Sequence, residues 1–141
     1  MLAYLRSAVH EARHREPFEA TVTVDDTELY VGDATCVLVG NVGTLKGGVE
    51  AFPDASVTDG LLDVAVVTAT GMREWAGLMV DAVRHRQHSA SSAQLAQGRK
   101  IEIALDGSHR YELDGGAKGT GRKFKLKIRP ASLTVCAPPP S

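Results

Sequence analysis

Asn41 to Asp63 read NVGTLKGGVEAFPDASVTDGLLD, between an apolar run at residues 34–39 and a second at residues 64–67. The two runs predict buried strands, which the stretch between them would join through about twenty residues. Connections longer than about 12–15 residues are uncommon in compact domains and are usually functional or disordered. Because this one carries Phe52, Val57 and Leu61, which disorder would leave in water, we expect an ordered, functional connection.

The composition is that of one globular domain. The chain has 141 residues, of which 43% are hydrophobic and 23% charged, and its formal net charge of −1 gives no overall attraction to nucleic acid. No apolar run is long enough for a transmembrane helix, and the first residues lack the apolar core of a signal peptide. We therefore expect a cytoplasmic protein, in which Cys36 and Cys136 are predicted to be buried free thiols.

The charge is unevenly distributed along the chain. Residues 11–74 contain twelve Asp or Glu and four Lys or Arg, whereas residues 99–129 contain nine Lys or Arg and four Asp or Glu. Either the two parts attract each other within one domain, or the basic part binds phosphate or an anionic surface. The basic part includes a row at Lys123, Lys125, Lys127 and Arg129, which on the first interpretation is a solvated strand face.

Hydrophobic periodicity predicts a mainly β chain with two short helices. The helices are expected at residues 2–16 and 72–88, and the strands at residues 18–24, 28–31, 34–39, 61–68, 100–105, 111–113, 123–129 and 133–136. Gly32-Asp33 is expected to end the second strand, Asp106-Gly107 to form a two-residue hairpin turn, and Asp114-Gly115-Gly116 to open another turn. Because strands and helices do not alternate, the expected fold class is an antiparallel β-sandwich or barrel.

Two interpretations of Asp59-Gly60-Leu61-Leu62-Asp63 remain open. A turn leading into a strand uses Asp for its side-chain bond to the backbone and Gly for its positive φ. A turn carboxylate beside exposed carbonyl oxygens is also a ligand set for Mg²⁺ or Ca²⁺. No Ser/His/Asp arrangement or phosphate-binding glycine loop stands out. The basic row lacks the interleaved aromatic side chains of a nucleic-acid surface, so no nucleic-acid partner is expected.

In the order of its motifs the chain resembles the C-terminal half of the diacylglycerol kinase and sphingosine kinase-like lipid kinases, including the bacterial YegS-type enzymes. The shared pattern comprises Gly40-Asn41, Gly47-Gly48, Pro53, Ala55, Asp59 to Asp63, the L-D-G turn within Tyr111 to Gly115, and the final strand pair around Ile128 to Leu133. The resemblance implies that residues 1–141 are the β-sandwich domain of a two-domain kinase. The N-terminal nucleotide-binding domain, with its G-G-D-G-T motif, is absent from this sequence, and a first helix without an N-cap residue fits that expectation.

The resemblance also implies an activity and its ligands. The joined domains would transfer the γ-phosphate of ATP to the hydroxyl of a lipid such as diacylglycerol, with peripheral membrane contact, and this chain alone would be inactive. ATP would be held mainly by the N-terminal domain, with contacts here at Asn41, Gly47 and Gly48. The family's structural Mg²⁺ would be held by the Asp59 carboxylate and the carbonyl oxygens of Ser56 and Leu61.

One position departs from the family pattern. The family's proposed general base is a glutamate directly after L-D-G, where this chain has Gly116. A hydroxyl that attacks a phosphate needs an acceptor for its proton, and Asp114 is the nearest carboxylate that could substitute. The alternative is a non-catalytic lipid- or partner-binding domain that has lost its base. A homodimer through an exposed β edge also remains open.

Overall fold

The structure is a computed structural model that describes residues 16–45, 49–70, 74, 77 and 92–136. The elements assigned to these residues are the strands β1 (Phe18–Val24), β2 (Thr27–Ala34), β3 (Cys36–Gly40), β4 (Thr44–Leu45), β5 (Val49–Glu50), β6 (Leu62–Val67), β7 (Ala93–Gly98), β8 (Lys100–Leu113) and β9 (Gly116–Lys127). The mainly β class is therefore confirmed. The two predicted helices have no counterpart among these elements, because their ranges lie, apart from single positions, outside the described residues. Within the described part of the chain, no helix is long and apolar enough to cross a membrane.

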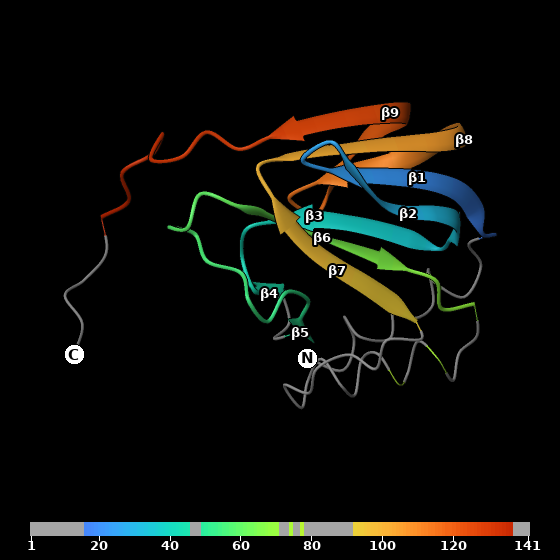
Figure 1. Ribbon diagram of the computed structural model, residues 1–141, viewed down its shortest axis with the longest axis horizontal. Helices are drawn as coiled ribbons and strands as arrows, with labels where there is room; N and C mark the ends of the chain where they lie inside the picture. The colour runs from blue at the N-terminus through green and yellow to red at the C-terminus, as the bar shows by residue number, and fades with distance from the viewer. Residues whose placement is uncertain (1–15, 46–48, 71–73, 75–76, 78–91, 137–141) are drawn as a thin grey trace.

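The strands form two antiparallel sheets that pack against each other (Figure 1). One sheet has four strands in the order β2-β1-β8-β9, and the other has three in the order β3-β6-β7; β4 and β5 form a separate short pair. The main core cluster draws side chains from both sheets: Ala20, Val22, Ala34, Val64, Val66, Ile101, Ile103 and Leu105. The predicted antiparallel sandwich is therefore confirmed.

The burial pattern of each strand follows from its place in the sandwich. On β8, Ile101, Ile103 and Leu105 are buried while the residues between them are half-buried, as expected of a strand with one face on the core. The central strand β6 is instead buried at every position from Asp63 to Val67. Burying each large aliphatic side chain contributes about 1.5–3 kcal/mol, so this central layer supplies much of the driving force for folding.

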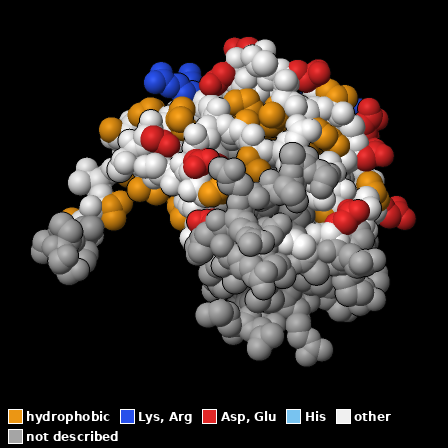
Figure 2. All heavy atoms as spheres, turned by 60° about the horizontal axis from the view of Figure 1, so that its bottom comes forward, with side chains coloured by type: hydrophobic (Ala, Val, Ile, Leu, Met, Phe, Trp, Pro, Cys, Tyr) orange, Lys and Arg blue, Asp and Glu red, His pale blue; other side chains and the backbone are white. Residues whose placement is uncertain are grey.

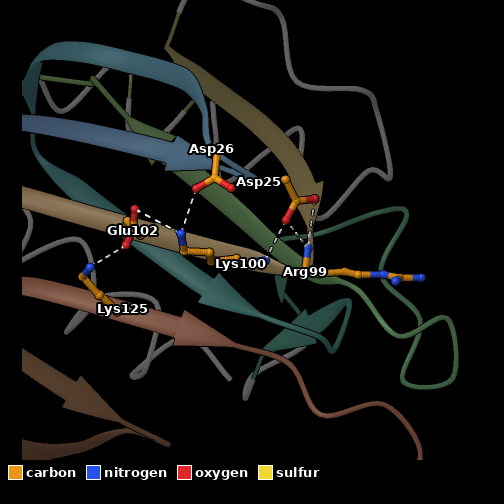
Figure 3. Close-up of polar contacts among 6 residues, drawn as sticks. All are labelled: Asp25, Asp26, Arg99, Lys100, Glu102 and Lys125. Carbon is orange, nitrogen blue, oxygen red and sulfur yellow. Dashed lines mark hydrogen bonds and ion pairs between the residues drawn. The ribbon is translucent and has the colours of Figure 1, made fainter.

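A corner at Asp25 joins the two sheets (Figure 3). The chain passes from β7 in one sheet to β8 in the other through Gly98, Arg99 and Lys100. The Oδ1 atom of Asp25 accepts hydrogen bonds from the backbone N–H groups of Arg99 and Lys100, both at 2.9 Å. The Asp25 N–H donates to the Lys100 carbonyl oxygen at 2.9 Å, so one residue of the β1–β2 turn fixes the path of the chain between the sheets.

Two predicted breaks in the strands were wrong. β2 continues through Gly32-Asp33 to Ala34, paired with β1 along its length. β8 continues through Asp106-Gly107, and a register irregularity between Ala104 and His109 absorbs the extra residues there. The Asp106 carboxylate accepts a hydrogen bond from His109 Nε2 at 2.9 Å. The side chain that was expected to form a hairpin turn therefore bonds within the irregular part of the strand. The hairpin turn lies at Asp114-Gly115, with φ of 51° and 76°.

Two other parts of the prediction also failed. Residues 133–136 do not close a sheet: Leu133 and Val135 are 85% and 82% exposed, and Cys136 is an exposed thiol. Cys36 is half-buried. In addition, β7 was not predicted, because its sequence AQLAQG has little strand propensity. Its hydrogen-bonding partner β6 imposes the strand conformation from Leu62↔Gly98 to Val67↔Ala93.

Candidate functional site

The connection between β3 and β6, which we name the crossover (residues 41–61), joins two strands that are neighbours in the three-stranded sheet. β3 and β6 are antiparallel partners from Cys36↔Val67 to Gly40↔Asp63. Phe52 anchors the crossover: its side chain is 2% exposed, and its backbone N–H donates to the Gly43 carbonyl oxygen at 3.2 Å. A Cβ on Gly40 would lie 3.1 Å from the Phe52 ring. The described part of the crossover is therefore ordered, as predicted.

The Asp59-Gly60 turn has the geometry expected of its sequence. Asp59 Oδ1 accepts from the Leu61 N–H at 2.8 Å, and Gly60 has a φ of 74°. Close by, Ser56 Oγ and Thr58 Oγ1 are hydrogen-bonded at 3.1 Å. The turn interpretation is thus confirmed. Within the described residues no three His, Cys, Asp or Glu side chains are grouped as a metal site.

Asp63 is the most unusual ionisable group of this region. It is 4% exposed, and its Oδ1 atom accepts from Gln97 Nε2 at 2.8 Å, whereas its buried Oδ2 atom has no hydrogen-bond partner among the residues that the structure describes. Burial raises the pKa of Asp63; the hydrogen bond from Gln97 opposes this change, and the charges of Asp59 and Asp54 add to it. The same Gln97 nitrogen donates to the Asp54 carbonyl oxygen at 3.1 Å.

Gln97 therefore ties the crossover to the three-stranded sheet. It lies on β7, opposite Asp63 in the register, and bonds both to that side chain and to the Asp54 backbone. Sequence reasoning missed Gln97, because β7 was not recognised as a strand. The only available signal was the polar residue next to Gly98 at the end of a weakly patterned segment.

Asp63→Asn is expected to make the protein more stable than wild type at pH 7, by about 1 kcal/mol. Because the folded pKa of Asp63 is raised above the ordinary value of 3.8, the folded protein holds more protons than the unfolded chain between the two values. Wild-type stability therefore falls as the pH rises through that window, whereas asparagine has no charge to bury. Urea unfolding between pH 3 and 7 should show the difference shrinking to zero below pH 3.8.

The exposed Asp54 supplies the control for that measurement. Asp54→Asn removes a charge from the same crossover without removing a buried carboxylate, and it should change stability by less than about 0.5 kcal/mol. If Asp63→Asn were less stable than wild type at pH 7, the ionised Asp63 would have to be a needed partner in the folded state.

The predicted site residues lie at two ends of the sandwich. Asn41 is half-buried and directly follows β3, beside the crossover turn, whereas Gly47 and Gly48 lie outside the described residues. Asp114 is exposed in the turn between β8 and β9. β8 begins at Lys100, next to the crossover end of β6 and β7, so the length of the β8–β9 hairpin, roughly 35 Å, separates Asp114 from that end. The structure does not bring Asp114 together with Asp59.

The chain matches a family model over nearly its whole length. The family is described as the YegS C-terminal NAD kinase beta sandwich-like domain, and the match covers residues 1–137. A Pectobacterium atrosepticum protein named "Probable lipid kinase YegS-like" is 30% identical over 77% of this chain and 34% of its own length. An uncharacterized Synechocystis protein is 24% identical over 98% of this chain and 33% of its own length. The chain thus spans about a third of the length of these relatives.

Solved structures show the same fold. A Bacillus anthracis str. Sterne protein described as "a putative diacylglycerol kinase" superimposes with a TM-score of 0.73 at 21% identity, over 90% of this chain and 43% of that one. A second crystal structure of a diacylglycerol kinase from that organism gives a TM-score of 0.62 at 22% identity, over 90% and 48% of the two chains. The family model matches residues 1–137, nearly the whole chain, so the chain belongs to the YegS C-terminal NAD kinase beta sandwich-like domain family.

Proposed function

We propose that this domain forms the lipid side of a kinase that transfers the γ-phosphate of ATP to a lipid hydroxyl, such as that of diacylglycerol. The observation that carries the proposal is the family match over residues 1–137. The ordered crossover, which ends in the family's D-G-L-L-D motif, is consistent with it. On this proposal a preceding nucleotide-binding domain supplies most contacts to ATP, and Asn41, Gly47 and Gly48 border the nucleotide from this side.

We also propose that Ser56, Asp59 and Leu61 hold a Mg²⁺ ion. Leu61 donates to one carboxylate oxygen of Asp59, and the other makes no hydrogen bond among the described residues. The carbonyl oxygens of Ser56 and Leu61 accept no backbone hydrogen bond within the same part of the chain. One carboxylate oxygen with two carbonyl oxygens suits a hard cation that keeps several of its waters. When bound, the ion would reduce the repulsion between Asp59 and the nearby Asp54 and Asp63.

Mg²⁺ is expected to raise the melting temperature of the wild type but not of Asp59→Asn. A ligand that binds only the folded state stabilises it by about 2.7 kcal/mol at one hundred times its Kd. Thermal unfolding with and without Mg²⁺ measures the shift, and Asp54→Asn, which changes another exposed acid of the crossover, should retain it. An equal shift in Asp59→Asn would show that Mg²⁺ binds elsewhere.

Asp114 is the proton acceptor that we propose for the wild-type chain. Its carboxylate is exposed, and it sits two residues before Gly116, the position of the family's glutamate. Positioning and electrostatics provide most of the catalysis in phosphoryl transfer, so a displaced acceptor would slow the reaction without abolishing it. The second candidate function, a non-catalytic lipid- or partner-binding domain, rests on the same observation, since glycine cannot accept a proton.

A kinase assay of the joined domains tests the proposal. The chain is fused to a nucleotide-binding domain of the kind that the proposal requires and is assayed with ATP, Mg²⁺ and diacylglycerol. Turnover is expected from the joined protein and none from the isolated chain. Turnover by the isolated chain, or ATP binding without any lipid phosphorylation by the joined protein, would contradict the assignment. The second of these results would favour the non-catalytic function.

A further inference from the structure

The outer face of the four-stranded sheet carries a row of lysines along β9. Phe124 and Leu126 are half-buried toward the core, whereas Lys123, Lys125 and Lys127 are exposed on the opposite face. Alternate residues of a strand lie about 6.6 Å apart, so the three amino groups are spread over roughly 13 Å of a flat surface. The alternation predicted for this segment is confirmed, and it gives the lysines one common direction.

Among the described residues, most of this positive charge has no ion-pair partner; Figure 3 shows the pairing of Lys125, the member of the row that it draws. Lys125 Nζ lies 2.8 Å from Glu102, and Lys100 shares that carboxylate at 3.6 Å and meets Asp26 at 2.8 Å. Lys123 and Lys127 make no ion pair among the described residues. The hydrogen bond from Lys125 lowers the pKa of Glu102, which is therefore ionised at neutral pH, yet one carboxylate leaves the row with an excess of positive charge.

The positive charge of this row is thus local, although the formal net charge of the whole chain is only −1. On the face drawn in Figure 2, Asp and Glu side chains are scattered, whereas the visible Lys and Arg side chains gather mostly in one place. Arg129 follows the row at the end of β9 and is exposed. Beyond it, Leu133 and Val135 are 85% and 82% exposed in an extended segment that leaves the sandwich. Exposed aliphatic side chains therefore follow four and six residues after the last of these cations, Arg129.

We propose that Lys123, Lys125 and Lys127 dock this domain onto the surface of an anionic phospholipid bilayer, and that Leu133 and Val135 enter its interfacial region. Basic residues close to an anionic leaflet each strengthen binding by roughly fivefold, and apolar side chains add to this when they insert. The proposal deepens the proposed function, because a kinase that acts on a membrane lipid must meet the bilayer. Vesicle binding is measured without lipid phosphorylation, so the docking proposal and the proposed kinase function can each fail while the other holds.

A bilayer fits this surface better than a nucleic acid. The exposed side of β9 from Lys123 to Lys127 carries no aromatic side chain on which a base could stack, because Phe124 points toward the core and contacts Tyr111. The exposed Leu133 and Val135 have no role in binding phosphates but suit the boundary between headgroups and acyl chains. Lysines on an edge strand also discourage pairing with another chain, and the experiment has to separate this effect from docking.

Co-sedimentation with vesicles of phosphatidylcholine, with and without phosphatidylglycerol, tests the proposal. Wild type is expected to bind only the anionic vesicles, less tightly as salt rises, and Lys123→Gln with Lys127→Gln should weaken binding roughly 25-fold. The control, Arg110→Gln with Lys118→Gln, removes the same charge near the far turn of the hairpin and should bind within about threefold of wild type. Leu133→Ser with Val135→Ser should lose the binding that survives at high salt.

Several results would overturn the proposal. Equal loss of vesicle binding in Lys123→Gln with Lys127→Gln and in Arg110→Gln with Lys118→Gln would mean that only net charge matters. Unchanged vesicle binding by Lys123→Gln with Lys127→Gln, together with self-association in light scattering, would assign the row to protection of the sheet edge. Complete competition by millimolar glycerol phosphate would indicate a site for a soluble phosphate, and tighter binding of a mixed-sequence RNA than of vesicles would indicate a nucleic-acid surface. If Leu133→Ser with Val135→Ser bound vesicles at high salt as tightly as wild type does, the two aliphatic side chains would not belong to the docking surface.

Discussion

Gly116→Glu in the joined two-domain protein is expected to raise turnover about 10²- to 10⁴-fold, the usual contribution of a positioned general base. Gly116 opens β9 and is half-buried, without the positive φ that would strain another residue. A Cβ there would lie 3.4 Å from the Leu113 carbonyl oxygen, which is an acceptable contact. A glutamate side chain can therefore be added at the turn without rebuilding it. The measurement is kcat for lipid phosphorylation at saturating ATP and Mg²⁺.

Asp114→Asn provides the matched comparison at the same turn. Asparagine, like aspartate, tolerates the φ of 51° found at Asp114, so the hairpin should keep its shape while the carboxylate is lost. We expect this change to lower the slow wild-type turnover and to have little effect when Gly116→Glu is also present. Activity that appears only with Gly116→Glu would mean that the wild-type domain is not catalytic. Equal activity of wild type and Gly116→Glu would mean that Asp114 or another group already acts as the base.

Gly98→Ala is expected to lower the free energy of unfolding by about 3 kcal/mol, at the upper end of the usual cost of overpacking. A Cβ at this position would overlap Val24 Cγ1 and lie 2.9 Å from Asp25 Oδ2. Neither neighbour can move easily. Val24 packs against the core, and Asp25 holds the backbone of Arg99 and Lys100. The added methyl group therefore pushes apart the corner where the chain passes between the two sheets.

Urea unfolding of Gly98→Ala against Gly77→Ala measures this effect with a chemically identical control. A Cβ on Gly77 would meet nothing within 4 Å, so this change should alter stability by less than about 1 kcal/mol and in the stabilising direction if at all. A difference of less than about 1 kcal/mol between the two variants would show that the Asp25 corner adjusts freely and does not fix the packing of the sheets.

The crossover shows what could be predicted and what could not. Its flanking strands, its order and its Asp59 turn followed from apolar runs, a buried phenylalanine and an Asp-Gly pair, all of which act over a few residues. Gln97 and the burial of Asp63 could not be predicted, because they depend on β7 pairing with β6 in a defined register. The Asp-Gly pairs within and directly after β8 make the same point: Asp106-Gly107 and Asp114-Gly115 both suit a turn, yet of these two pairs only the second forms the hairpin turn.

Local sequence therefore determined most of the strands, the sandwich class and the family motif, since alternation and turn chemistry are properties of neighbouring residues. The tertiary structure alone decided which Asp-Gly pair turns the chain, because continuing β8 to Leu113 gains a long hydrogen-bonded ladder with β9. It also decided that Asp63 is buried, with one oxygen that has no hydrogen-bond partner in the described part of the chain, and that Asp114 and Asp59 lie at opposite ends of the sandwich. Each of these outcomes depends on contacts between residues far apart in the chain, whose energies no short window of sequence contains.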